Sequence, residues 1–149
     1  MKVKLICIGK LKEPNILNLC NNYSKKISFD AKLEILEIKA STREEEGKKI
    51  IESLDRIKDN KFVFVLGEEG QQINSIEFSN KLKKLDLDGK TIVLVIGGPF
   101  GLSEEVKQKA DCLMSLSKMT FTHEMARLFL LEQIYRVISI IKNKSYHKE

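Results

Sequence analysis

The stretch from residue 91 to residue 106, TIVLVIGGPFGLSEEV, constrains the fold more than any other part of the chain. Residues 91–96 are almost all β-branched or aliphatic, which is typical of a central strand covered on both faces in a parallel sheet. The glycines of residues 97–101 permit positive φ and close backbone approach, and Ser103 offers a helix N-cap. Ligands of open α/β sheets bind at the carboxyl ends of such strands. We therefore expect a binding loop here, and a tight connection that holds no ligand is the alternative.

Length and composition indicate one soluble globular domain over residues 1–149. The chain is 42% hydrophobic and 32% charged, and its net charge of +5 permits a polyanionic partner without requiring one. The N-terminal MKVKLICIGK favours a first strand over a signal peptide, so we expect a cytoplasmic protein. Cys7, Cys20 and Cys112 lack the spacing of a disulfide framework or a zinc site, and we expect no metal.

Apolar runs that alternate with helical patterns predict an α/β fold, a parallel-type sheet with helices on both faces. Besides the central strand, we expect strands at residues 2–9, 33–38, 62–66 and 112–117. The strand ends at residues 67–70 and 118–121 are predicted to be loops that could lie beside the glycine loop. Gly9 stands alone after the first strand, so the GxGxxG fingerprint is absent, which argues against a nicotinamide or flavin dehydrogenase.

The longest predicted helix runs from residue 122 to about residue 142. Residues 125–131 are apolar nearly all round, and such a helix must be covered on two sides. The sheet can cover one side and a second copy of the chain the other, so we expect a homodimer. Arg127 and Arg136 interrupt the apolar run before it could span a bilayer, and we expect no membrane association. The polar tail after residue 142 is of a kind that usually frays.

Three motifs resemble one family: IGGPFGLS at 96–103, SLSKMTFTHEMARLFLLEQIYR at 115–136, and YHKE at 146–149. The chain is similar over essentially its full length to the bacterial ribosomal RNA large-subunit methyltransferase H family of the SPOUT superfamily. The resemblance implies a SPOUT-like homodimer with a C-terminal trefoil knot. It also implies methyl transfer from S-adenosyl-L-methionine to N3 of a pseudouridine in 23S ribosomal RNA. The periodicities themselves do not indicate a knot.

The family's cofactor contacts, carried over by position, coincide with the three strand-end loops. They fall on Leu66, Gly97, Leu116, Ser117, Lys118, Met119, Thr120 and Phe121. Apolar members of this set would form walls and the glycine loop would present backbone groups, although each apolar residue could equally belong to the core. The chain departs from the family in having Thr122, in place of proline, before His123. Thr122 can instead cap the helix.

Candidates for catalysis follow from the acceptor, an imide nitrogen that is largely protonated at neutral pH. A group that accepts or orients this proton would help, and the candidates are His123, Arg127, Tyr146 and His147. Tyr135 and Arg136 are candidates for contact with RNA, because tyrosine can stack on bases and arginine suits phosphates. Each candidate also has a purely structural interpretation. His123 could be an ordinary residue of the first helical turn, Arg136 could form a salt bridge across the dimer, and the tail could be frayed.

Two rival functions remain open at this stage. One is a non-catalytic dimeric α/β module that binds a nucleotide or RNA. The other is a SPOUT methyltransferase that acts on transfer RNA. The sequence alone does not decide which histidine handles the proton.

Overall fold

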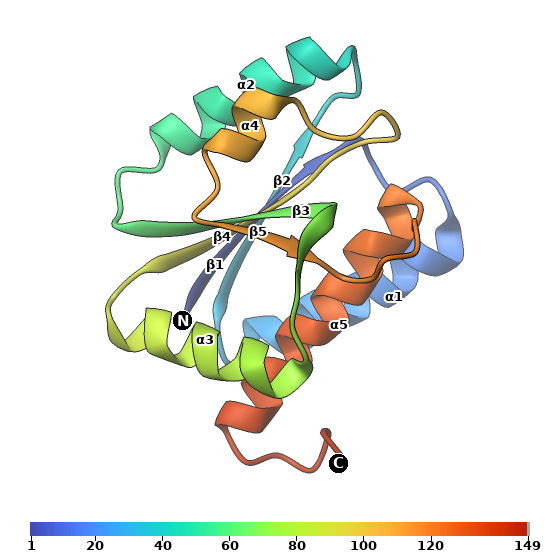
Figure 1. Ribbon diagram of the computed structural model, residues 1–149. Helices are drawn as coiled ribbons and strands as arrows, with labels where there is room; N and C mark the ends of the chain where they lie inside the picture. Colours follow the sequence, from blue (N-terminus) through green and yellow to red (C-terminus); the bar gives the residue numbers. More distant parts are fainter. Residues whose placement is uncertain (149) are drawn as a thin grey trace.

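The chain folds around a single five-stranded parallel sheet, seen in a computed structural model that describes residues 1–148 (Figure 1). The strand order is β2-β1-β4-β3-β5, and all four strand pairs are parallel. The strands are β1 (Lys2–Ile8), β2 (Lys32–Ile38), β3 (Lys61–Gln72), β4 (Thr91–Ile96) and β5 (Cys112–Ser115). Every residue of β4 is buried. The predicted central strand is therefore confirmed.

Helices connect the strands, and short polar side chains cap most of them. They are α1 (Pro14–Ser28), α2 (Arg43–Arg56), α3 (Ser75–Leu87), α4 (Glu104–Gln108) and α5 (His123–Ile141). Asn74 and Glu77 form a complete capping box at α3, Ser103 caps α4, and Thr122 caps α5. These bonds satisfy helix N–H groups that have no partner within the helix.

Helices cover the two faces of the sheet unequally. In Figure 1, α2 and α4 lie on one face, and α1, α3 and α5 lie on the other. Each face has its own apolar cluster: Ile50 of α2 and Val106 of α4 belong to one, and Ile27 of α1 and Leu82 of α3 to the other. The prediction of helices on both faces is confirmed.

Two strand ends differ from the prediction. Residues 67–70 were expected to form a loop, but β3 continues through them to Gln72, with a register shift between Leu66 and Gln71 against β5. These four residues have no partner in β5, because Leu66 and Gln71 both pair with Met114, so they form a bulge within the strand. Gly70 permits the close return of the chain to β5 after the bulge, because a Cβ there would lie 2.5 Å from the backbone carbon of Met114. The fifth strand ends at Ser115, before the predicted residue 117.

The apolar helix α5 is covered largely within one chain. It packs between α1 and α3, and buries residues from Leu130 to Ile138 in the larger cluster. The second covering layer that we assigned to another copy is thus supplied by two neighbouring helices. Phe129 stays 36% exposed. No helix within residues 1–148 is both long and apolar enough to cross a membrane.

Candidate cofactor pocket and catalytic residues

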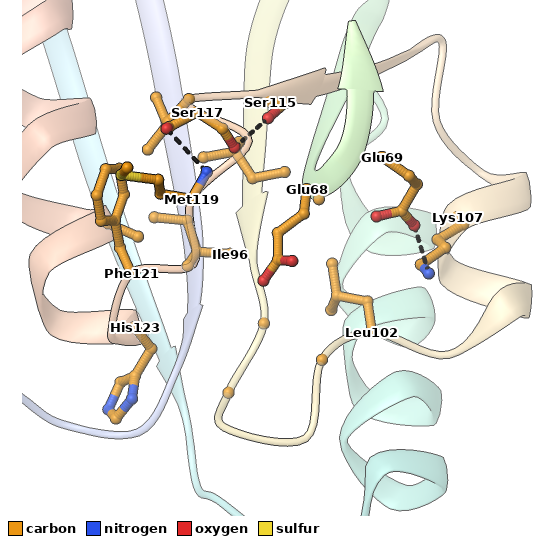
Figure 2. Close-up of a pocket in the computed structure, with 17 residues that line it drawn as sticks. Glu68, Glu69, Ile96, Leu102, Lys107, Ser115, Ser117, Met119, Phe121 and His123 are labelled. Atoms are coloured by element: carbon orange, nitrogen blue, oxygen red, sulfur yellow. Dashed lines mark hydrogen bonds and ion pairs between the residues drawn. The ribbon is translucent and has the colours of Figure 1, made fainter. Parts of the chain in front are cut away.

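A cavity of about 240 Å³ opens where β3, β4 and β5 end (Figure 2). Its lining comes from residues 66–69 of β3, the glycine loop after β4, Lys107 of α4, and the loop between β5 and α5. The start of α5 closes one side with His123 and Ala126. Of the predicted cofactor residues, those lining the cavity are Leu66, Gly97, Leu116, Ser117, Met119 and Phe121. Lys118 and Thr120 belong to the same loop but are not among the lining residues.

The glycine loop is shaped by close backbone packing. A Cβ at Gly97 would lie 2.8 Å from Cγ of Leu102 and 3.2 Å from the backbone carbon of Gly101. Gly101 adopts a φ of 74° and donates its N–H to the carbonyl of Gly98 at 3.0 Å. Position 97 has no room for a Cβ, and at position 101 glycine adopts the left-handed backbone at less cost than other residues. The loop therefore presents its backbone directly to the cavity.

A buried carboxylate supports this loop from the side of α2. Glu46 is 2% exposed, and its Oε2 accepts the N–H of Ser41 at 2.9 Å. Its Oε1 has no hydrogen-bond partner among the described residues and would lie 3.4 Å from a Cβ at Gly98. A side chain at Gly98 would thus meet a carboxylate, which is a further reason for glycine at this position.

The loop after β5 is held by its own hydroxyl groups. Ser115 Oγ donates to the carbonyl of Ser117 at 2.7 Å, and the N–H of Met119 donates to Ser117 Oγ at 3.0 Å. Thr120 Oγ1 donates to Glu68 Oε1 at 2.7 Å, which ties this loop to β3. Met119 is 76% exposed. The loop is therefore ordered by local bonds while its apolar side chains stay available to a ligand.

Sequence reasoning missed the charged groups of the cavity. Glu68, Glu69 and Lys107 all line it, and Lys107 Nζ lies 2.6 Å from Glu69 Oε1. The hydrogen bond from Lys107 lowers the pKa of the Glu69 carboxyl, and the same bond raises the pKa of Lys107. The glutamates lie within the segment that was predicted as a loop, and their position at a strand end was the available signal.

His123 is the one predicted catalytic residue that lines the cavity. Thr122 Oγ1 accepts the N–H of Met125 at 3.2 Å, so the threonine that replaces the family's proline begins α5 with a regular cap. Glu124 Oε1 accepts the N–H groups of Lys12 and Glu13, at 2.8 and 3.1 Å. These bonds fix the start of α5 against the segment after β1, and so position His123.

Arg127 points away from the cavity. Its Nη1 donates to Glu37 Oε2 of β2 at 2.7 Å, and the residue is only 8% exposed. It also influences Cys7, whose pKa burial raises to about 12 while the arginine's charge opposes the rise. This position favours a structural role for Arg127, joining α5 to the sheet, over contact with a substrate.

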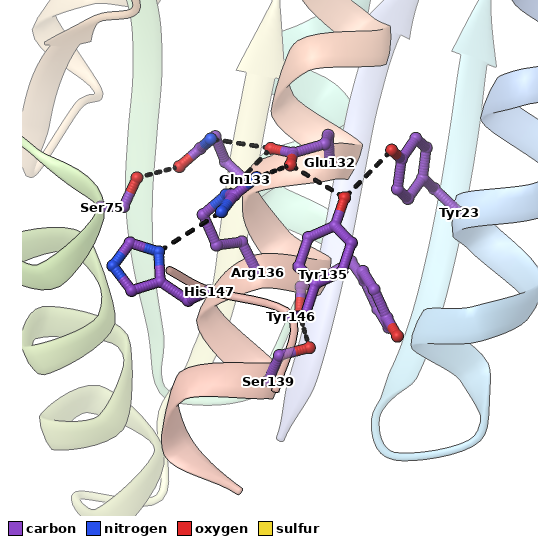
Figure 3. Close-up of polar contacts among 9 residues, drawn as sticks. All are labelled: Tyr23, Ser75, Glu132, Gln133, Tyr135, Arg136, Ser139, Tyr146 and His147. Carbon is purple, nitrogen blue, oxygen red and sulfur yellow. Dashed lines mark hydrogen bonds and ion pairs between the residues drawn. The ribbon is translucent and has the colours of Figure 1, made fainter. Parts of the chain in front are cut away.

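The remaining candidates form a separate cluster at the other end of α5 (Figure 3). The Tyr146 hydroxyl donates to Glu132 Oε1 at 3.0 Å and lies 3.2 Å from the Tyr23 hydroxyl. Its ring packs edge-on against Tyr135, with centroids 4.7 Å apart, and under the guanidinium of Arg136 at 4.8 Å. Burial, followed by these hydrogen bonds, raises the pKa of the Tyr146 phenol. The tail is thus ordered along the helix rather than frayed; Glu149 lies outside the described residues.

Arg136 joins His147 to this cluster. It forms an ion pair with Glu132, and its Nη1 lies 3.3 Å from Nδ1 of His147. A guanidinium can only donate, so Nδ1 is the acceptor and the proton of a neutral imidazole is on Nε2. His123 and Arg136 are about 20 Å apart along α5, at about 1.5 Å of rise per residue.

A second cavity, of about 620 Å³, lies between these two groups. It shares Ser115, Leu116 and Phe121 with the first cavity and extends to Glu132 and Gln133. Its walls include Phe129, whose ring packs against Phe121 with centroids 5.1 Å apart. Within residues 1–148, no group of three or more histidine, cysteine, aspartate or glutamate side chains could hold a metal ion.

Comparison with known proteins identifies the family. The family described as Predicted SPOUT methyltransferase matches residues 1–147. The chain belongs to this family. Curated relatives called ribosomal RNA large subunit methyltransferase H include one from Enterococcus faecalis, 40% identical over 162 residues, covering 99% of this chain and 100% of the relative. Another, from a Thermotoga species, is 44% identical over 151 residues and covers 99% of both chains.

Solved structures agree on the fold of this SPOUT methyltransferase. A putative methylase from Neisseria gonorrhoeae matches with a TM-score of 0.58 and 14% identity, over 91% of this chain and 82% of that one. The SpoU methyltransferase AviRb from Streptomyces viridochromogenes, crystallised with AdoMet, matches with a TM-score of 0.51 and 10% identity, over 91% and 57%. The predictions of a SPOUT-type fold and of a methyltransferase are confirmed.

Proposed function

We propose that this SPOUT methyltransferase transfers a methyl group from S-adenosyl-L-methionine to N3 of a pseudouridine in the large-subunit ribosomal RNA. The observation that carries the proposal is the cavity at three neighbouring strand ends, lined at most of the positions that correspond to the family's cofactor contacts. The names of the curated relatives support the ribosomal RNA substrate. Such a substrate implies action in the cytoplasm, where ribosomes are assembled.

The residues of the cavity suit this cofactor. A Cβ at Gly97 would collide with Leu102 and Gly101, so glycine at this position keeps the loop in the shape that can present its backbone to the adenine edge. Leu66, Leu116 and Met119 offer apolar walls for a flat ring. The cofactor supplies a methyl group activated by a sulfonium, and the chain's task is to align that methyl with the acceptor nitrogen. Positioning of this kind contributes roughly 7–11 kcal/mol in favourable cases.

The imide proton has to leave as the methyl arrives, and His123 is the described candidate nearest to the cofactor site. It lines the cavity, and its backbone is fixed by the Thr122 cap and the Glu124 bonds. Tyr146 and His147 would serve the same step only after leaving their contacts with Glu132 and Arg136. We propose that RNA binding releases the tail and that Tyr135 and Arg136 then become contacts for RNA.

The protein is proposed to act as a homodimer. Met119 and Phe121, which line the cofactor cavity, are 76% and 37% exposed, and Phe129, whose ring packs against Phe121, is 36% exposed. A contiguous apolar patch of this kind is typical of an interface. Light scattering at micromolar concentration is expected to give about twice the 17.1 kDa chain mass.

The decisive test is methylation of ribosomes from cells that lack this protein. The purified chain is incubated with S-adenosyl-L-methionine and either ribosomes or total transfer RNA, and the RNA is analysed by mass spectrometry. We expect one methylated pseudouridine in 23S RNA and no change in transfer RNA. Modification of transfer RNA alone would overturn the proposed substrate. No modification of either RNA, with binding intact, would favour a non-catalytic binding module.

A further inference from the structure

The fixed charges of the cofactor cavity do not cancel. Its lining holds two carboxylates, Glu68 and Glu69, and one ammonium, Lys107. Lys107 and Glu69 neutralise each other through their contact of 2.6 Å, and Glu104 adds a weaker contact to Lys107 at 3.6 Å. Glu68 forms no ion pair with any residue from 1 to 148. The cavity therefore carries one uncompensated negative charge.

Glu68 also occupies the central position. In Figure 2 its side chain projects from β3 among the lining residues, between Ile96 and Leu102, whereas Glu69 turns to the rim toward Lys107. Its Oε1 accepts a hydrogen bond from Thr120 at 2.7 Å. That bond comes from a neutral hydroxyl, so it orients the carboxylate and leaves its charge in place.

We propose that Glu68 is a specificity-determining residue that selects S-adenosyl-L-methionine over its demethylated product, S-adenosylhomocysteine. The inference rests on the proposed function of the cavity. The sulfonium joins the adenosine and methionine parts, so a cofactor that fills the cavity places this positive charge near its middle. A carboxylate facing the same place attracts it, and because Glu68 is exposed to solvent the attraction is of moderate size.

Methyl transfer removes the charge that Glu68 attracts. The carbon–sulfur bond breaks, its electron pair stays on sulfur, and the acceptor nitrogen forms the new bond to carbon while its proton passes to a base or solvent. Sulfur thereby changes from a cationic sulfonium to a neutral thioether. Since the product keeps the adenosine and amino-acid groups but not this charge, Glu68 strengthens the binding of the substrate and leaves that of the product unchanged.

Glu68 is not expected to accelerate the methyl-transfer step. Positive charge on sulfur decreases toward the transition state, so a carboxylate beside it stabilises the bound substrate more than the transition state. Loss of the carboxylate should therefore weaken substrate binding without slowing a single turnover at saturating cofactor.

The test compares wild type, Glu68→Gln and Glu69→Gln by calorimetry with both ligands. The two variants remove the same charge from adjacent residues, one central and one paired at the rim, so they form a matched pair. Glu68→Gln is expected to weaken S-adenosyl-L-methionine about tenfold or more and to leave S-adenosylhomocysteine within about twofold. Glu69→Gln should change the ratio of the two affinities less than about threefold. Thermal unfolding checks that both variants fold.

Three outcomes would overturn the inference. Equal weakening of both ligands by Glu68→Gln would show a structural role for the residue. If Glu68→Gln binds both ligands with the affinities of the wild type, Glu68 does not recognise the sulfonium, and the proposed function still stands. A wild-type chain that binds neither ligand would overturn the proposed function together with this inference.

Discussion

The two ends of α5 organise their functional residues by different means. At its start, the cavity is shaped by backbone: a glycine loop, a four-residue bulge in β3, and a capped helix. At its end, the cluster around Tyr146 is held by side chains alone, through the hydroxyl of Tyr23, the carboxylate of Glu132 and the guanidinium of Arg136. Backbone geometry suits a pocket that is present before the ligand arrives. Side-chain bonds at a half-exposed surface can be exchanged for other partners, which suits contact with RNA.

The largest effect is expected at the start of α5, where the backbone shapes the cavity. Gly97→Val adds a Cβ that would lie 2.8 Å from Cγ of Leu102. The loop would have to move to relieve this contact, and the cofactor site would change shape. We expect S-adenosyl-L-methionine binding to be lost in calorimetry. Gly89→Asn is the matched control, because Gly89 has a φ of 70° in a turn with open space around it and asparagine tolerates such a backbone. Unchanged affinity in Gly97→Val would mean that the loop is only structural.

Removal of the tail tests the other end. Deletion of residues 145–149 should leave cofactor affinity within about twofold and lower methylation of ribosomes at least about a hundredfold, the scale of a lost acid–base or positioning group. His147→Ala and Tyr146→Phe should divide this loss between proton handling and the hydroxyl. If the truncated chain methylates at the parent rate, the tail has no catalytic role and His123 is the remaining candidate.

Arg127 lies near the start of α5 but belongs to neither group. Arg127→Ala removes the partner of Glu37 and should lower the free energy of unfolding by about 1–3 kcal/mol, the cost of leaving a part-buried polar group unsatisfied. Methylation per folded molecule should stay close to the parent rate. Denaturant unfolding and single-turnover kinetics measure the two quantities. A slower turnover at unchanged stability would restore Arg127 as a catalytic candidate.

The smallest effect concerns the Tyr146 phenol. Burial and its hydrogen bonds raise the pKa of this group above the ordinary value of about 10. Its contribution to stability is therefore fully present below about pH 10 and is lost as the pH rises through the folded pKa. An ultraviolet titration should show one of the tyrosines ionising after the others, and Tyr146→Phe should remove that late step. A titration without a late step would mean that the tail is not docked on α5 in solution.

Much of the scaffold could be predicted because its signals are local. The unbroken apolar run of β4 indicates a strand covered on both faces, and the Asn74 and Thr122 caps mark helix starts. These features depend on the residues within a few positions of one another. Close resemblance in the C-terminal third identified the family before any geometry was known, and the trefoil knot that it implies stays a prediction.

Other features were decided only by contacts between distant segments. The glycines and glutamates of residues 67–70 predict a turn, but only the fold shows that they form a bulge within β3, with Leu66 and Gln71 both paired with Met114, and that Glu68 lines the cavity. The apolar surface of α5 indicated a second copy, yet α1 and α3 cover most of it. Nor does spacing along the chain reveal that Arg127 faces Glu37 rather than the cavity. A sequence pattern records how much apolar or polar surface a segment has, whereas the partner that meets this surface depends on which segments the fold brings together.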